Sequence, residues 1–104
     1  MTKHAHEGEL QRMVFRLNAR TQLDAFEAAK FLYDKADSRL ASPLIRVLKR
    51  GRKPFNRAAA AYVMQVVATP RTIAALERTV NDTAESSRVR GEAAESLAHA
   101  HRRE

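Results

Sequence analysis

The densest group of side chains that could bind a ligand surrounds Gly51. Its members are all basic: Arg46, Lys49, Arg50, Arg52, Lys53 and Arg57. Such a cluster can bind phosphate or the carboxylates of an acidic protein. Runs of charge are also common on surfaces that bind nothing. The residues alone leave both interpretations open.

Other side chains offer little chemistry. His4 with His6 and His99 with His101 form two His-x-His pairs, but a metal site needs three or four converging ligands, and residues two apart on a helix diverge. The chain has no cysteine, which excludes disulfides and thiolate metal sites. It also lacks a nucleophile motif and a glycine-rich phosphate loop. We therefore expect no enzyme activity, no cofactor, no metal and no small-molecule substrate.

Composition favours a small, basic, helical protein. The 104 residues fit one domain, 1–104, and the formal net charge is +7, from 19 Lys and Arg against 12 Asp and Glu. This charge favours acidic partners such as a protein surface or nucleic acid. The first twelve residues lack the apolar core of a signal peptide, and no apolar run reaches the ~18 residues of a membrane span. We expect a cytoplasmic protein without a membrane partner.

Apolar residues recur at spacings of three and four, which predicts helices throughout the chain. The predicted helical runs are 9–19, 21–35, 38–50, 54–68, 70–81 and 87–102. Thr69 and Pro70 suit the N-cap and first residue of a helix, and Asp37 suits the same N-capping role at the start of the preceding repeat unit. Gly51 suits the left-handed residue that ends the run 38–50. No stretch has the alternation of a β-strand.

A two-helix unit recurs with a period near 32 residues. Ala-Ala pairs begin at Ala28, Ala60 and Ala93, and each is followed by a large apolar residue. In the preceding helices, Leu10, Leu44 and Leu76 align, and so do Arg12, Arg46 and Arg78. Approximate repeats are 9–36, 37–68 and 69–103. This period predicts stacked antiparallel helix hairpins, in which small Ala residues let the second helices pack closely.

The segments VRGEAAESLAHA (89–100), ASPLIRVLKR (41–50) and TIAALERTV (72–80) resemble the short HEAT-like repeats known from phycobilisome lyases. The resemblance implies an all-α, right-handed α-solenoid of about three hairpins and a habit of binding proteins, not lyase activity. It also implies a structural role for Arg57 and Arg90, which would bond to carbonyls or to an Asp of the preceding turn. The first repeat has Ala25 at that position.

Two functions follow from these features. The first is a non-catalytic binding module or adaptor for an acidic protein, using the groove between the second helices or the basic stripe that Arg12, Arg46 and Arg78 would form in stacked hairpins. The second is a basic nucleic-acid-binding protein, which the low aromatic content of 6% disfavours. Tyr33 and Tyr62 could be exposed binding aromatics or core residues. The candidate partner-binding residues are Arg12, Arg46, Arg78, Lys49, Arg50, Arg52 and Lys53, although arginine stems can also simply cover apolar surface.

Overall fold

The computed structural model describes the backbone of residues 3–103 and the side chains of residues 8–102. Within that range the chain is all-helical and contains no strand. Its elements are α1 (Lys3–Arg16), α2 (Gln22–Lys35), the 3-10 turn η1 (Ser38–Leu40), α3 (Ala41–Arg50), α4 (Pro54–Val63), α5 (Pro70–Asn81) and α6 (Ser87–Arg103). The predicted all-α fold class is therefore confirmed.

Predicted and observed helix bounds agree best for α5 and least for α1, which begins at Lys3 and ends at Arg16 instead of spanning 9–19; α4 differs only at its end. The predicted run 54–68 ends as an α-helix at Val63, because the chain then tightens into i to i+3 hydrogen bonds. The amide of Gln65 donates to the carbonyl of Tyr62 at 3.1 Å, and that of Val66 donates to Val63 at 3.0 Å. This tighter geometry is common in a last helical turn. The end of α1 tightens in the same way after Arg16.

Helix caps follow the sequence in two places and differ at Gly51. The Thr69 side chain accepts the amide of Thr72 at 3.1 Å, and Pro70 is the first residue of α5, as predicted. Asp37 caps η1 through the amide of Arg39 at 2.9 Å. The expectation of a left-handed Gly51 is wrong, because its φ is −55°. Glycine is needed there for space: a Cβ would lie 2.8 Å from the carbonyl oxygen of Val47.

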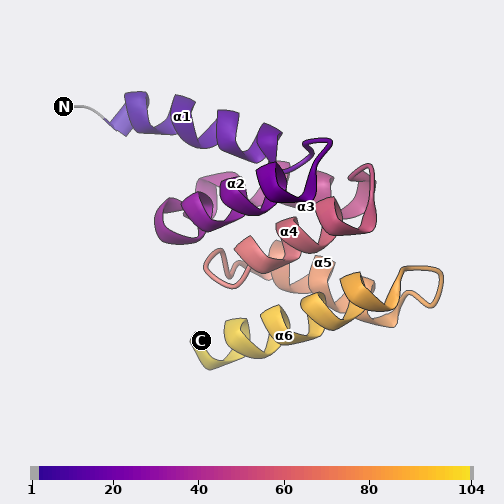
Figure 1. Cartoon of the computed structure of the whole chain (residues 1–104). Helices are drawn as coiled ribbons and strands as arrows, with labels where there is room; N and C mark the ends of the chain where they lie inside the picture. Colours follow the sequence, from indigo (N-terminus) through magenta and orange to yellow (C-terminus); the bar gives the residue numbers. More distant parts are fainter. Residues whose placement is uncertain (1–2, 104) are drawn as a thin grey trace.

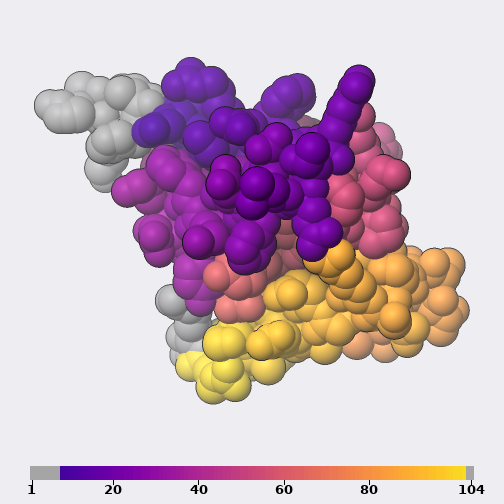
Figure 2. All heavy atoms as spheres, viewed as in Figure 1, coloured from indigo at the N-terminus to yellow at the C-terminus, as the bar shows by residue number. Residues whose placement is uncertain are grey.

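Helices that follow one another in the chain run in opposite directions and pack as pairs, α1 with α2, α3 with α4 and α5 with α6 (Figure 1). Helix α4 also packs on α2 and on α6, so it lies in the middle of the molecule. The described fold measures 44 × 33 × 17 Å. In Figure 2 the N-terminal helices and the C-terminal helix occupy opposite sides, with the middle of the chain between them.

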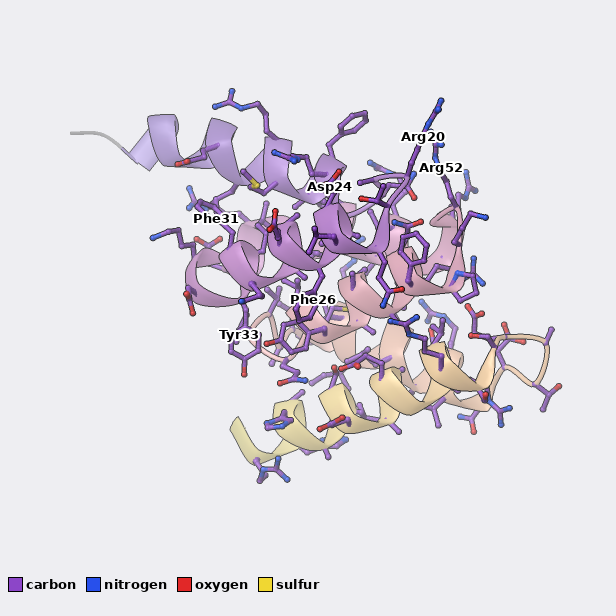
Figure 3. All side chains as sticks on the ribbon, in the orientation of Figure 1. Arg20, Asp24, Phe26, Phe31, Tyr33 and Arg52 are labelled. Carbon is purple, nitrogen blue, oxygen red and sulfur yellow. The ribbon has the colours of Figure 1, made fainter. Side chains whose placement is uncertain are left out.

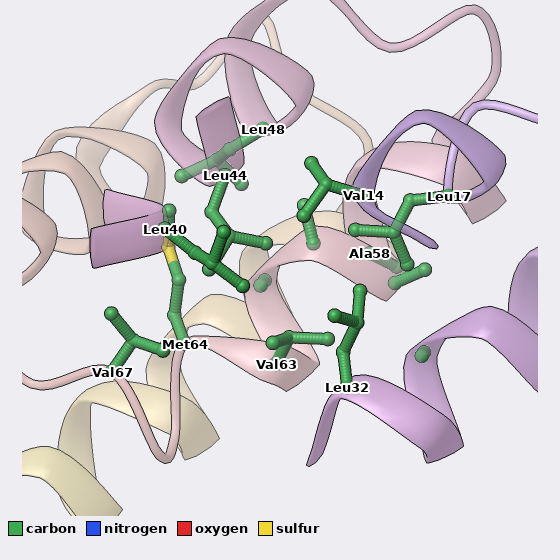
Figure 4. Close-up of a cluster of buried hydrophobic side chains, with 14 of the residues drawn as sticks. Val14, Leu17, Leu32, Leu40, Leu44, Leu48, Ala58, Val63, Met64 and Val67 are labelled. Atoms are coloured by element: carbon green, nitrogen blue, oxygen red, sulfur yellow. The ribbon is translucent and has the colours of Figure 1, made fainter. Parts of the chain in front are cut away.

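A single apolar core joins all six α-helices of the described residues, and Figure 4 shows a part of it around α1, α2, α3 and α4. Val14 and Leu17 of α1 belong to it together with Leu44 and Leu48 of α3. Met64, directly after α4, is fully buried in this core. Because α4 is packed from several sides, every Ala from 58 to 61 is buried.

Residues that align between the sequence repeats have similar exposure. Three aligned sets behave alike: buried Leu10, Leu44 and Leu76; buried Ala28, Ala60 and Ala93; exposed Arg12, Arg46 and Arg78. The third repeat departs at Ala94, which is exposed although the aligned Ala29 and Ala61 are fully buried. No further helix within the described residues covers that side of α6.

Candidate functional site

The basic loop between α3 and α4 is fastened to the end of α1 by two asparagines. Asn56, fully buried in the first turn of α4, donates to the carbonyls of Leu17 at 2.7 Å and Ala19 at 2.9 Å. Its side-chain oxygen accepts the amide of Lys53 at 3.1 Å. Asn18 accepts the amide of Arg52 at 2.8 Å. The bonds donated by Asn56 satisfy carbonyls at the end of α1, and the two accepted by the asparagine oxygens satisfy amides of the loop.

A hollow of about 340 Å³ lies between α1 and α3, beside that loop. Val14, Pro43 and Val47 form its apolar lining, and Phe15 stands at its edge. Phe15 is 82% exposed, the highest value among the large apolar side chains described. An apolar hollow with an exposed aromatic is a common feature of protein-binding surfaces.

Two of the predicted site residues, Arg46 and Arg50, line the same hollow. Both extend from α3 and are exposed. The hollow has no acidic lining residue, so the two guanidinium charges are not offset within it. Arginine is one of the residue types enriched in the energetic centres of interfaces, and aromatic residues are enriched in interfaces generally.

A second hollow, between α3 and α5, contains Lys49 and Arg78. Asp82 and Glu85 line it as well, so its positive charge is offset. Of the arginines predicted to form the basic stripe, Arg46 and Arg78 therefore line different hollows. Arg12 lies exposed on α1 and lines neither of the two.

The remaining predicted residues, Arg52 and Lys53, are exposed in the loop that the asparagines hold. Figure 3 shows Arg52 projecting from the same end of the molecule as Arg20, which lies in the neighbouring loop after α1. None of the seven predicted site residues forms an ion pair within the described part of the chain. Their role in partner binding stays a prediction.

Arg57 and Arg90 bond as structural residues, as the resemblance implies. Arg57 donates to the carbonyl of Gly51 at 2.9 Å and makes two further bonds of 2.9 Å to the carboxylate of Glu85. The acidic partner of Arg57 is Glu85 of the α5–α6 loop, and the turn before Arg57 contains no aspartate. The Arg57 hydrogen bonds hold the pKa of Glu85 below its usual range. Arg90 lies 3.5 Å from the carbonyl of Val80.

The groove between the second helices is small and nearly neutral. Its volume is about 90 Å³, and Arg88 and Glu92 both line it. Burial is the main cause of the raised pKa of Glu92, with the nearby Glu95 charge second. Phe26, 53% exposed, stands beside it.

Tyr33 and Tyr62 join α2 to α4. Their rings stack with centroids 4.8 Å apart and an angle of 25° between planes. The Tyr33 hydroxyl donates to the side-chain oxygen of Gln65 at 3.2 Å. Both tyrosines are half-buried, and burial raises the pKa of Tyr62, followed by the effect of Tyr33. Of the two interpretations, packing between helices accounts for both rings.

The basic cluster extends further than the loop. Between Asp37 and Glu77 the chain contains no Asp or Glu and eight basic residues: Arg39, Arg46, Lys49, Arg50, Arg52, Lys53, Arg57 and Arg71. Of these, Arg39 pairs with Asp37 and Arg57 with Glu85. The exposed charge that remains is concentrated on α3 and the loop after it.

The described residues also bear on two sequence-based expectations, about metal sites and membrane-spanning helices. The side chains of His4 and His6 lie outside the described residues, and among residues 8–102 no group of three His, Asp or Glu could hold a metal ion. No helix in the described range combines the length and apolar character of a membrane span.

Sequence reasoning did not single out Phe15, Asn18 or the contacts of Asn56. For Phe15 a signal existed: it follows Val14 by one residue, about 100° around the helix, and so falls outside the apolar stripe of α1. For the asparagines no local signal existed, because Asn56 contacts carbonyls 37 and 39 positions earlier.

Comparison with protein-family models and with curated proteins finds no match to this chain. Its function is therefore inferred from the charge and geometry of the site.

Proposed function

We propose that this protein is a non-catalytic binding module that recognises an acidic region of another protein through α3 and the α3–α4 loop. The observation that carries the proposal is the set of exposed, unpaired basic side chains on α3 and its loop, in a 39-residue segment (38–76) that has no acidic residue. Carboxylates of a partner would meet no competing carboxylate in the hollow between α1 and α3.

Rigidity of the loop supports a binding role. Its backbone is bonded to the side chains of Asn18 and Asn56, so the basic residues around Gly51 start from a fixed backbone. A surface that is already ordered loses less conformational entropy when a partner binds. A merely hydrated turn would not need this anchoring, although the anchoring also stabilises the fold.

We also infer that the chain is a HEAT-like stack of three helix hairpins. The pairing of successive helices supports this arrangement, and so does the contact of α4 with both α2 and α6. The similar exposure of aligned residues supports it further, because a repeated residue in stacked units meets a repeated environment. In such a stack α3 lies on the outer layer, away from the groove of the second helices.

The test is a fluorescence-anisotropy titration of a labelled Glu-rich peptide at about 0.02 M and about 0.15 M salt. The test variant replaces Arg46, Lys49, Arg50 and Lys53 with Gln. The control variant replaces four other exposed basic residues with Gln and lowers the net charge equally: Lys30, Lys35, Arg88 and Arg102. We expect the first variant to lose at least tenfold in affinity while the control loses less than threefold, since loss of a specific contact exceeds loss of general charge.

Equal losses in both variants, or no binding by the wild type, would refute the proposal. A parallel titration with labelled single-stranded DNA and RNA tests the nucleic-acid alternative. Tighter binding to these probes than to the peptide, with affinity falling steeply as salt rises, would favour that alternative.

A further inference from the structure

The hollow between α1 and α3 combines two chemistries that a simple electrostatic surface does not need. Arg46 and Arg50 supply charge, whereas Val14, Pro43 and Val47 supply an apolar lining. The volume of about 340 Å³ is at the lower end of the range for ligand pockets. It therefore has room for one large side chain rather than for a whole folded element.

Phe15 marks the apolar part of this surface. A phenylalanine that is 82% exposed gains little from folding, because its ring stays in water. A ring covered by a partner would gain the burial that the folded monomer does not provide. Its position at the edge of the hollow means that one inserted side chain would contact both the ring and the apolar lining.

We propose that the hollow takes a single large apolar side chain from an acidic segment of the partner protein, with neighbouring carboxylates paired to Arg46 and Arg50. This inference rests on the proposed function and specifies the partner: an acidic peptide interrupted by an aromatic or Leu residue, not a run of acidic residues alone. Charge complementarity selects the acidic residues, and the lining selects the apolar one.

The end of the hollow beside the α3–α4 loop is held by hydrogen bonds before any ligand binds. Asn18 lines the hollow and accepts the amide of Arg52, while Asn56 holds the carbonyls of Leu17 and Ala19. The spacing between the end of α1 and the end of α3 is therefore set by hydrogen bonds. A preformed hollow favours one shape of side chain over others.

The experiment uses the full chain and two labelled 12-residue peptides of equal charge, both Glu and Ser, with either Phe or Ser at the centre. The wild type should bind the Phe peptide about tenfold more tightly than the Ser peptide, as expected for burial of an aromatic side chain. The Phe15→Ser variant should keep the affinity for the Ser peptide but lose most of the preference for the Phe peptide, because the ring is one of the apolar surfaces that an inserted side chain would contact. Because Phe15 is exposed, this variant should keep the wild-type fold, which circular dichroism checks.

The matched control is Leu23→Ser, which removes another exposed apolar side chain, 65% exposed, on α2. It should keep the preference for the Phe peptide. Equal binding of the two peptides by the wild type would overturn the inference and leave the proposed function intact. An undiminished preference in Phe15→Ser, or loss of the preference in Leu23→Ser, would place the apolar side chain elsewhere and also overturn it. Failure to bind either peptide would refute both proposals.

Discussion

Replacing Asn56 with Ala should be among the most damaging single changes in the chain. The side chain is fully buried and makes three hydrogen bonds, two as donor to Leu17 and Ala19 and one as acceptor from Lys53. Alanine would leave these three backbone groups without a side-chain partner. A buried polar group that loses its partner costs about 1–3 kcal/mol, and water can reach some of the groups near Ala19. We therefore expect a loss of about 2–4 kcal/mol in the free energy of unfolding.

For a chain of about 100 residues, each kcal/mol lowers the Tm by roughly 4 °C, so the Tm should fall by about 8–16 °C. Urea unfolding followed by circular dichroism gives the free energy, and a thermal melt gives the Tm. The matched control is Asn81→Ala, because Asn81 is exposed and donates only to Glu77 within its own helix. It should change stability by less than about 0.5 kcal/mol.

A second variant at position 56 separates the loss of hydrogen bonds from the loss of side-chain volume. Asn56→Asp keeps the shape and can still accept the amide of Lys53, but it cannot donate to the two carbonyls and places a charge against them. It should be at least as unstable as Asn56→Ala. If both Asn56 variants melt within 2 °C of the wild type, the claim that this side chain fastens α4 to α1 is wrong.

Three further predictions concern stability. Glu85→Gln should cost about 1–3 kcal/mol at pH 7, because Arg57 loses its anionic partner. Since the folded pKa of Glu85 is lowered, its contribution is present above the usual Glu pKa and is lost as pH falls through the lowered value. The gap to wild type in urea unfolding should therefore shrink as the pH falls below the usual Glu pKa. A gap that widens in acid would contradict this. Gly51→Ala should cost about 1–3 kcal/mol, because the added Cβ would lie 2.8 Å from the carbonyl oxygen of Val47 and 2.9 Å from Cγ of Arg57. Gly91→Ala, in open space within α6, should stabilise the protein by about 0.5–1 kcal/mol. Equal effects of the two substitutions in chemical unfolding would rule out the packing argument. Met64→Asp should prevent folding by burying an unpaired charge, and a soluble Met64→Asp protein with wild-type melting would refute the central position of α4.

The sequence predicts the helices well because their signals are local. The cap Thr69, the following Pro70 and the apolar spacing in 70–81 all lie within α5, and the observed bounds match. The end of α4 is harder to predict, since Val66 and Val67 continue the apolar pattern after the α-helix has ended at Val63. Whether these residues form an α-helix or tighter turns depends on packing around them, which no local pattern records.

The candidate site could be predicted only in part, for a similar reason. The charge of a residue is known from its type, so Arg46 and Arg50 could be identified as candidate binding residues from the basic residues around them. The hollow they line exists because α1 and α3 pack at a particular separation, and its depth depends on Val14 and Val47 from different helices. The difference in charge between the two hollows also depends on the position of Glu85, which bonds to Arg57 and lines the hollow between α3 and α5.

The first turn of α4 holds two consecutive residues that bond in opposite directions along the molecule. Asn56 reaches back to the end of α1, and Arg57 reaches forward to Glu85 in the loop before α6. In repeat proteins, neighbouring units can open one at a time when the coupling between them is weak. Here buried or half-buried polar bonds to both neighbouring helix pairs start from one turn, so opening that turn breaks both sets of bonds together. The chain should consequently unfold as a single cooperative unit, with amide protection of nearly equal free energy from α2 to α5.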